Sequence, residues 1–450
     1  MKQQVDVAII GAGLTGLTLA FYLKKAGKKV IILEQKKRTG GVMHTIEKEG
    51  FIFETGPNSG SMGTPEMAEL FEDLGDAVQL EVANEQAKER WIWKDGKWHN
   101  LPSGLWSGLK TPLFRFSDKI RILGEPFRPK GNKVNESVAE LVERRLGKSY
   151  LDYAVNPFIS GIYAGDPKQL VTQYALPKLY QLEQNYGSFI RGAMKKAKTR
   201  TERDKKATRV VFSAKGGKQK IIDALSQAVG YENILLGIDQ LSISHKAPFS
   251  IQLQNQAIEA KKVVSTTGAK ALPQLFPFVD KQLMNKVHQL RYAKVVQAVV
   301  GFHQWKGKAL TAFGGLIPEK EKKDVLGILF PSAIFSNRAP QGGALMTFFM
   351  GGIKRPDIIA MSDEEIKAIV QRELKATLQC DEVPDLLEIK RYQEAIAQYD
   401  ATSLERLTAI QKIETQYPGL ILAGNIRDGI GMSDRVKQAR KIAEQLSSTN

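Results

Sequence analysis

Apolar runs and turn residues follow one another near the N-terminus in the order of a βαβ unit. The β-branched run 5–10 leads into three glycines, and apolar positions with helical spacing then extend over residues 17–26 and stop at Gly27. A second apolar run, 29–33, ends at the acidic residue Glu34. This pattern predicts a strand, a glycine turn, a helix and a second strand.

The three glycines have the spacing of a dinucleotide-binding turn. In such a turn Gly11 permits the bend, Gly13 lets a pyrophosphate approach the main chain, and Gly16 lets the helix pack on the strand. Glu34 lies 21 residues beyond Gly13, where its carboxylate can accept hydrogen bonds from ribose hydroxyls. A second glycine pair, Gly40-Gly41, follows where a plain nicotinamide domain would begin another helix, which favours an extended FAD site.

The C-terminal part of the chain repeats the order of strand, turn and helix. Residues 420–424 form an apolar run, 425–432 a glycine-rich turn, and Ser433-Asp434 the predicted N-cap of a helix that ends at Leu446. In flavoenzymes of the glutathione reductase type, such a helix points its N-terminus at the flavin pyrimidine, where negative charge develops on reduction. An ordinary strand-to-helix connection is the structural alternative.

The middle of the chain mixes strand and helix patterns. Residues 210–228 contain a glycine pair before an apolar helix, and residues 233–253 alternate like antiparallel strands before the apolar run 262–269. Capping boxes at Ser137 and Ser362 predict two further amphipathic helices with a structural role.

Composition narrows the class of protein. With 450 residues, 42% apolar and 25% charged, the chain is an ordinary globular protein. No apolar run approaches the roughly 18 residues of a membrane span, and no signal peptide is visible, so we expect a cytoplasmic protein. The single cysteine, Cys380, and the scattered histidines predict neither a disulfide framework nor a metal site. The net charge of +17 indicates an anionic partner, either nucleic acid, an acidic bilayer or a multi-carboxylate substrate.

Two segments could provide the contact with an anionic partner. Residues 91–127 hold four of the five tryptophans among lysines and arginines, and residues 191–209 carry nine basic and two acidic side chains. The structural interpretations are that the aromatic residues of the first segment belong to the core and that the second segment is a solvated loop. A surface that contacts lipid or lines a substrate site is the functional interpretation.

Four segments make the chain resemble the FAD-dependent protoporphyrinogen oxidase family of the flavin amine oxidase superfamily. They are residues 11–17, 56–59, 156–167, and 422–425 with 429–431. The first is shared by many flavoproteins, whereas residues 156–167 resemble porphyrinogen oxidases specifically. The resemblance extends over essentially the whole chain.

The resemblance implies an α/β fold with a discontinuous Rossmann-like FAD domain of the glutathione reductase and amine oxidase type. We assign this domain to residues 1–84, 207–269 and 388–450. A mixed-sheet substrate domain is expected from residues 270–387 with 85–104, and a helical, membrane-associated region from residues 105–206.

The implied activity is the six-electron oxidation of protoporphyrinogen IX to protoporphyrin IX in haem biosynthesis, with dioxygen as electron acceptor. No side chain is expected to act as a catalytic group, because flavin N5 takes the hydride. The alternatives are oxidation of coproporphyrinogen III to coproporphyrin III, an amine oxidase or carotenoid desaturase of the same fold, and a flavin-free binding protein.

The resemblance also assigns site residues. Apolar side chains of Leu316, Leu329 and Phe349 would enclose the macrocycle beside Gly165, and Lys94 would pair with a propionate as a point charge. The residues expected to bind the cofactor are Gly11, Gly13, Leu14, Thr15, Gly16, Glu34, Gln35, Arg38, Gly40, Gly41, Gly56, Pro57, Asn58, Ser59, Leu241, Thr266, Gly424, Asn425, Gly431, Met432 and Ser433.

The partners implied are the porphyrinogen, a ferrochelatase that receives the product, a second copy of the chain in a homodimer, and an anionic membrane surface. We expect peripheral attachment at the inner face of the cell membrane. We do not expect the protein to bind nucleic acid.

Overall fold

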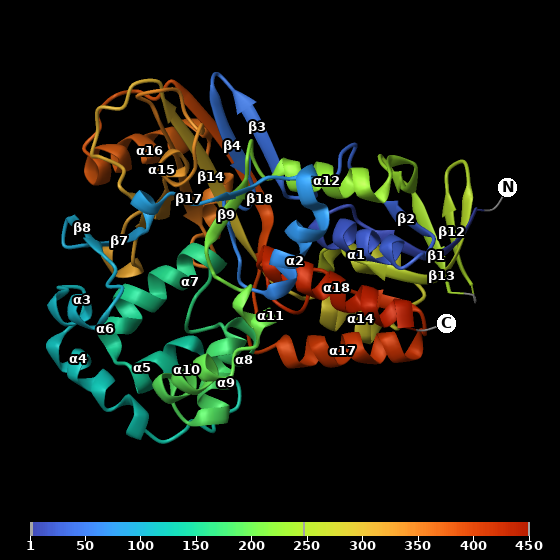
Figure 1. Ribbon diagram of the computed structural model, residues 1–450, viewed down its shortest axis with the longest axis horizontal. Coiled ribbons are helices and arrows are strands. Elements are labelled where there is room, and N and C mark those ends of the chain that lie inside the picture. The colour runs from blue at the N-terminus through green and yellow to red at the C-terminus, as the bar shows by residue number, and fades with distance from the viewer. Residues whose placement is uncertain (1–2, 246–247, 449–450) are drawn as a thin grey trace.

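The computed structural model describes residues 3–245 and 248–448. It has three parts: a sheet layered between helices, a second large sheet, and a helical region below the second sheet (Figure 1). Both ends of the chain lie at the first part (Figure 1). The predicted α/β fold is confirmed, and the outermost residues of the predicted FAD domain, 1–2 and 449–450, lie outside the described residues.

The first sheet joins the two ends of the chain through β13. Strand β1 pairs with β13 in parallel on one side, and β19 pairs in parallel with the carboxyl end of β13 on the other. The strands are β1 (Gln3–Ile10), β2 (Val30–Leu33), β10 (Ile234–Leu235), β11 (Leu241–Ser244), β12 (Phe249–Leu253), β13 (Ala257–Ser265) and β19 (Leu420–Leu422), in the order β10-β2-β1-β13-β12-β11 with β19 beside β13. The alternating segment 233–253 thus supplies the antiparallel pair β11 and β12.

Helices cover both faces of this sheet. Val7 and Ile9 of β1 pack under α1 and α18, whereas Ala8 and Ile10 belong to the core under α14 and α17. A strand buried on both faces explains the continuous apolar run at 5–10. The helices are α1 (Leu14–Lys25), α2 (Pro65–Leu74), α12 (Gln219–Val229) and α18 (Met432–Ser448) on one face, and α13 (Leu272–Leu275), α14 (Lys281–His288) and α17 (Ser403–Gln416) on the other.

The second sheet is mixed. Its order is β18-β14-β17-β16-β15-β7-β8, and only β15 and β7 run parallel to each other. The strands are β7 (Glu89–Lys94), β8 (Lys97–Asn100), β14 (Tyr292–Phe302), β15 (Ala312–Leu316), β16 (Val325–Leu329), β17 (Ala344–Gly351) and β18 (Leu386–Ala397), with α15 (Pro331–Ile334) and α16 (Asp363–Leu378) packed on them. Strand β18 crosses the predicted boundary at residue 388, because it pairs with β14 in this sheet.

Two small sheets connect the large ones. The hairpin β3 (His44–Lys48) and β4 (Phe51–Thr55) packs on the second sheet, where Phe51 and Phe53 contact Val299. Strands β5 (Gly60–Ser61), β9 (Val211–Ala214) and β6 (Leu80–Val82) form the other.

The helical region is held by a buried ion network. Arg145 is fully buried and lies 2.9 Å from Glu125 and 2.7 Å from Glu183 through its Nη1 and Nε atoms. The Glu125 carboxylate also accepts from the Phe189 amide at the start of α10. The helices are α3 (Leu105–Lys110), α4 (Phe116–Leu123), α5 (Val138–Arg145), α6 (Lys148–Tyr150), α7 (Asn156–Tyr163), α8 (Thr172–Ala175), α9 (Pro177–Tyr186), α10 (Phe189–Lys198) and α11 (Glu202–Lys205).

Three further sequence expectations can be compared with the structure. Both predicted capping boxes form, at Ser137 before α5 and at Ser362 before α16. Among the described residues, no helix combines the length and apolar character needed to cross a membrane. The tryptophans differ in burial, because Trp91 and Trp93 are core residues whereas Trp106 is 78% exposed.

Candidate active site

The glycine turn before α1 is closely packed at Gly16 and open at Gly13. An added Cβ on Gly16 would lie 2.0 Å from the Gly11 carbonyl oxygen, so Gly16 is fixed by the packing of α1 on β1. By contrast, a Cβ on Gly13 would meet nothing within 4 Å. No side chain caps α1, so the amides of Leu14 and Thr15 are free to bind an anion. This combination fits a pyrophosphate seated at the helix N-terminus.

Glu34 is fixed beside that turn. Its Oε2 accepts from the Ala12 amide at 2.7 Å and its Oε1 from the Lys36 amide at 2.9 Å. A carboxylate has about four acceptor positions, so it can still accept from ribose hydroxyls. Thr266 closes the turn by donating to the Ile10 carbonyl at 3.0 Å. Gln35 is exposed next to Glu34, and Leu241 at the start of β11 packs on the same core as Leu33.

The second glycine pair lies directly against the first turn. Gly40 forms a parallel bridge with Gly13, and its amide donates to the Ala12 carbonyl at 2.8 Å. Both Gly40 and Gly41 have positive φ, at 101° and 61°. Arg38 donates to the carbonyls of residues 39, 41 and 43, so it shapes this loop from within.

The C-terminal turn meets the N-terminal turn at Gly424. A Cβ on Gly424, whose φ is +90°, would lie 2.8 Å from the Thr266 carbonyl oxygen, which only glycine permits. The Asn425 side chain accepts from the Tyr292 hydroxyl at 3.4 Å. The structure therefore gathers residues 11–16, 40–41, 266 and 424–425 in one place.

The predicted N-cap of the last helix is wrong by two residues. Helix α18 begins at Met432, so Ser433 lies in its first turn. The Gly431 carbonyl accepts from the Arg435 amide at 3.0 Å, and the Asp434 carboxylate accepts from the Gly431 amide at 3.1 Å. Ser433 instead accepts from the Gly63 amide and donates to the Ser61 carbonyl. The Ser433 hydroxyl therefore does not cap the helix, because it bonds to Ser61 of β5 and to Gly63 instead.

Residues 56–59 join the first sheet to the second. The Gly56 amide donates to Oε1 of Gln297 on β14 at 3.3 Å, and Thr347 on β17 donates to Oδ1 of Asn58 at 3.1 Å. Pro57 and Ser59 are half-buried between them. Gln297 is 1% exposed, and its Nε2 donates to the Glu54 carbonyl at 2.6 Å. Sequence reasoning missed Gln297, although a single glutamine inside the apolar run 295–302 was a signal of a buried polar contact.

One face of the second sheet carries an apolar row that continues from Gln297. Gln297 pairs with Phe349, Phe349 with Gly327, and Gly327 with Leu316, across four neighbouring strands. Leu329 pairs with Thr347, two positions along, and points to the same face. The alternating residues Ile328, Phe348 and Met350 are buried on the opposite face. Leu316, Leu329 and Phe349 are half-buried, and Leu316 and Phe349 also pack on two small apolar clusters.

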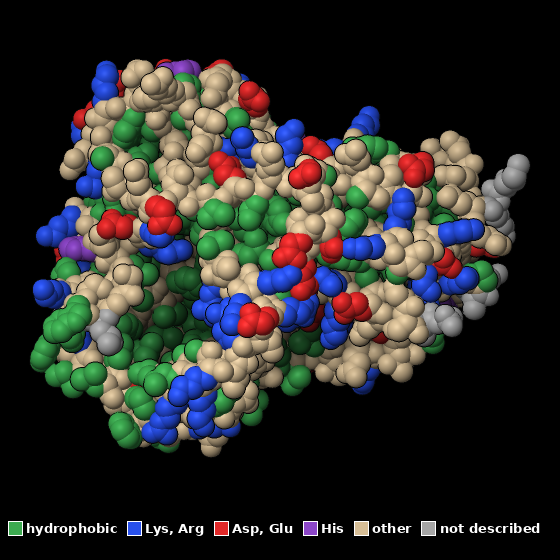
Figure 2. All heavy atoms as spheres, in the orientation of Figure 1, with side chains coloured by type: hydrophobic (Ala, Val, Ile, Leu, Met, Phe, Trp, Pro, Cys, Tyr) green, Lys and Arg blue, Asp and Glu red, His purple; other side chains and the backbone are tan. Residues whose placement is uncertain are grey.

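Helix α7 lies against this apolar row. A Cβ on Gly161 would lie 2.5 Å from Cδ2 of Leu316, which shows how closely the helix approaches. On the same helix Phe158 and Ile162 are 42% and 46% exposed. Figure 2 shows a hollow with hydrophobic walls where Figure 1 places α7. We call the half-buried apolar face of Leu316, Leu329 and Phe349 beside α7 the slot; an apolar face of this kind suits a planar hydrophobic molecule.

Gly165 and Lys94 lie at the edges of the slot. Gly165 follows α7, and a Cβ there would lie 2.6 Å from the Gln398 side-chain oxygen. Lys94 donates to the Pro112 carbonyl at 2.6 Å and lies 4.7 Å from the centre of the Tyr153 ring. Leu316 and Tyr153 share a small cluster, so Lys94 stands near the slot with its ammonium already engaged. Its pairing with a propionate stays a prediction.

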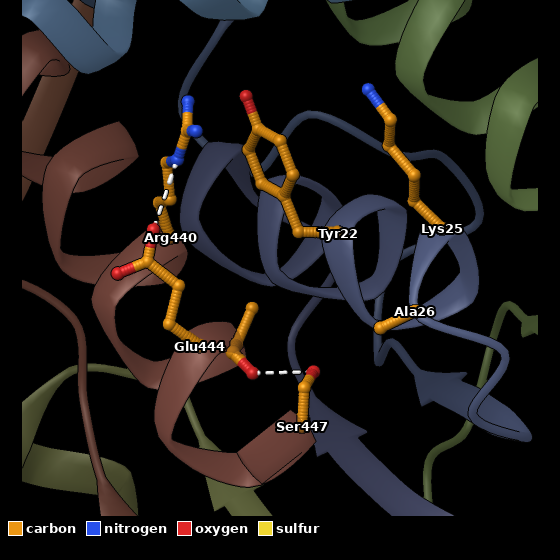
Figure 3. A pocket seen from close by; sticks show the side chains of 7 residues that line it. Tyr22, Lys25, Ala26, Arg440, Glu444 and Ser447 are labelled. Atoms are coloured by element: carbon orange, nitrogen blue, oxygen red, sulfur yellow. Dashed lines mark hydrogen bonds and ion pairs between the residues drawn. The ribbon is translucent and has the colours of Figure 1, made fainter.

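A separate depression lies at the other end of α1 (Figure 3). It has a volume of about 260 Å³ and is lined by Tyr22, Lys25, Ala26, Arg440, Ala443, Glu444 and Ser447. The Tyr22 hydroxyl is 3.0 Å from Asp73, and burial raises the pKa of this hydroxyl, so it stays neutral. Arg440 pairs with Glu444 at 3.2 Å. Because these groups satisfy one another far from the glycine turn, the depression is a surface ion-pair cluster.

Comparison with known proteins gives one consistent result. The family model described as flavin containing amine oxidoreductase matches residues 14–446. Protoporphyrinogen oxidase 2 of Arabidopsis thaliana is 30% identical over 98% of this chain and 94% of its own length. Coproporphyrinogen III oxidase of Bacillus subtilis is 25% identical over 96% of both chains. The crystal structure of a provisionally named protoporphyrinogen oxidase from Exiguobacterium sp. 255-15 superposes with a TM-score of 0.82 at 22% identity, covering 100% of both chains.

Proposed function

Because the chain belongs to the protoporphyrinogen oxidase family of flavin-containing amine oxidoreductases, we propose that it oxidises protoporphyrinogen IX to protoporphyrin IX, with FAD as cofactor and dioxygen as acceptor. The observation that carries this proposal is the half-buried apolar row of Leu316, Leu329 and Phe349 beside the segment 56–59. The broad apolar surface of a tetrapyrrole suits such a row of side chains, whereas a small amine offers little apolar surface to it.

The residues of the chain would bind and orient both molecules. The free amides at the start of α1 and Gly13 would hold the FAD pyrophosphate, Glu34 the ribose, and the turns 56–59 and 424–432 the flavin end. When bound, FAD supplies the acceptor for a hydride from the substrate and passes the electrons to dioxygen. Leu316, Leu329 and Phe349 would hold the macrocycle and exclude water, which keeps the reacting carbon at a fixed approach.

A comparison of substrates tests this function. Purified, flavin-loaded protein should convert protoporphyrinogen IX with growth of porphyrin fluorescence and uptake of dioxygen in three two-electron rounds. The measurement is kcat/KM for protoporphyrinogen IX and coproporphyrinogen III side by side, with non-enzymatic oxidation subtracted. A tenfold preference for coproporphyrinogen III would establish the second candidate, which the Bacillus subtilis relative favours. Dioxygen uptake with primary amines and none with either porphyrinogen would reject both.

We further propose that the helical region attaches the protein to an anionic bilayer at the inner face of the cell membrane. Exposed apolar side chains cluster on α3, α4 and the loop after them, with exposed fractions of 78% for Trp106, 73% for Phe116, 69% for Leu123 and 83% for Phe127. The Arg191 guanidinium lies 5.5 Å from the Phe127 ring. Figure 2 shows hydrophobic side chains along the lower left edge and basic ones over α10. Aromatic side chains flanked by basic ones suit a lipid interface.

Removing two of these aromatics should detach the protein from vesicles. With phosphatidylserine-containing vesicles at low salt, the double change Phe116→Ser and Phe127→Ser is expected to lower the bound fraction at least about tenfold, because each buried ring contributes about 2 kcal/mol. Co-sedimentation measures the bound fraction. Leu404→Ser, on α17 and 52% exposed, is the matched control and should bind like the parent. Absence of binding by the parent at low salt would reject the attachment.

A further inference from the structure

Two buried arginines hold the turn that precedes α18. Arg406 is 1% exposed, and its Nε donates to the Ile426 carbonyl at 3.0 Å. Arg435 is 8% exposed, and its Nη2 donates to the Arg427 carbonyl at 2.9 Å. The remaining acceptors are neutral: Ser403 for Arg406 and Gln438 for Arg435. Both guanidiniums therefore face the same short stretch of main chain.

Neither guanidinium forms a direct ion pair with a described residue. Within the described part of the chain, neither lies within 4.0 Å of an acidic oxygen, and Nη1 of Arg406 and Nε of Arg435 have no acceptor. The acids that act on them from a distance bond to other groups: Asp434 accepts from the Gly431 amide at 3.1 Å, Asp428 from Gln438 at 2.8 Å, and Asp400 from the Thr402 hydroxyl at 2.6 Å. Burial lowers the pKa of both guanidiniums, which reflects how poorly their charge is solvated.

An uncompensated buried charge is expensive. Its effective cost in a protein is several kcal/mol per ion, which main-chain carbonyls offset only in part. Buried groups with perturbed ionisation cluster at functional sites. The turn that both arginines hold adjoins the glycine turn, because Gly424 contacts Thr266, and Gly431 is exposed at the start of α18. The N-terminus of α18 adds its positive dipole at the same place.

We propose that Arg406 and Arg435 stabilise the negative charge that bound flavin gains when it is reduced, and so raise its reduction potential. Two electrons and one proton from a hydride donor convert the neutral oxidised ring into a reduced ring with one negative charge. Both arginines contact the turn rather than the ring, so they are positioning residues that act across it. The inference rests on flavin binding but not on which porphyrinogen is the substrate.

The test separates charge from structure. Arg406→Gln and Arg435→Gln remove one charge each, whereas Arg406→Lys and Arg435→Lys keep it. Arg440→Gln is the matched control, because Arg440 lies further along the same helix, α18, and pairs with Glu444 at 3.2 Å. The readout is the midpoint potential of the flavin-loaded protein, equilibrated with redox dyes and without any porphyrinogen. A second readout is the dissociation constant of the sulfite adduct, which also places negative charge on the ring.

Each glutamine variant is expected to destabilise the reduced flavin about tenfold relative to the oxidised form, because it removes one unit of positive charge behind the turn. For a two-electron couple that ratio is about 30 mV. The sulfite dissociation constant should rise by a similar factor, and the lysine variants and Arg440→Gln should match the parent. Unchanged potentials in both glutamine variants would overturn the proposal, as would an equal fall in the lysine variants or the control. If one glutamine variant loses flavin, the set at the other arginine decides by the same criteria.

Discussion

Replacing Gly13 by alanine is expected to abolish FAD binding while the fold persists. The backbone of Gly13 has φ −76° and ψ 179°, which any residue adopts, and an added Cβ would meet no atom within 4 Å. The methyl group would instead occupy the space into which the pyrophosphate must fit. We expect at least a hundredfold loss in affinity, about 3 kcal/mol. As an N-cap, alanine costs only about 1 kcal/mol of stability.

The measurements are FAD titration of the apoprotein by flavin fluorescence and thermal unfolding of the apoprotein. Gly108→Ala is the control for binding, because a Cβ at Gly108 likewise meets nothing within 4 Å but faces no predicted ligand. Gly16→Ala provides the contrast, since its Cβ would clash with the Gly11 carbonyl and should lower the unfolding temperature as well. If Gly13→Ala bound FAD with the affinity of the parent, the pyrophosphate could not lie at this turn.

Placing a carboxylate in the slot should abolish porphyrinogen oxidation without loss of flavin. Leu316→Asp and Phe349→Asp each put a charge on the half-buried apolar row, where it would be desolvated by the macrocycle and repelled by its propionates. We expect kcat/KM to fall at least about a hundredfold, about 3 kcal/mol in transition-state stabilisation. The rate is followed by porphyrin fluorescence at matched flavin content, read from absorbance.

Two controls limit the interpretation. Leu404→Asp introduces the same charge on exposed α17 and should leave kcat/KM unchanged. Leu316→Met conserves volume and polarity and should lose no more than about threefold, since such swaps cost little. Flavin-loaded aspartate variants that worked at the parental rate would show that the substrate lies elsewhere.

Local sequence signals predicted the nucleotide-binding elements well. The run 5–10, the glycine turn and the capping boxes at Ser137 and Ser362 each encode their structure within a few residues, and the structure has them in place. Errors arose where a distant segment competes for a local group. Ser433 looked like an N-cap, but its hydroxyl bonds to Ser61 and Gly63, far away in the chain.

The slot could not be derived from local pattern. Leu316, Leu329 and Phe349 came from resemblance alone, because the row that unites them depends on strand register and on a bulge in β16. The role of β18 was hidden for the same reason, since its partner β14 lies far from it in sequence. The resemblance also did not reveal the hydrogen bond of Lys94, whose ammonium donates to the Pro112 carbonyl.

The position of β13 has a consequence for the order in which the protein can be made. Its partner β1 is synthesised well before it, whereas β19, which pairs with residues 263–265, is synthesised long after it. Until then the carboxyl half of β13 presents an unpaired strand edge, which is prone to join other chains. Pairing across such distances also folds slowly. A nascent chain of this protein therefore exposes this edge from the synthesis of β13 until that of β19, and we expect flavin to bind only once β19 has paired.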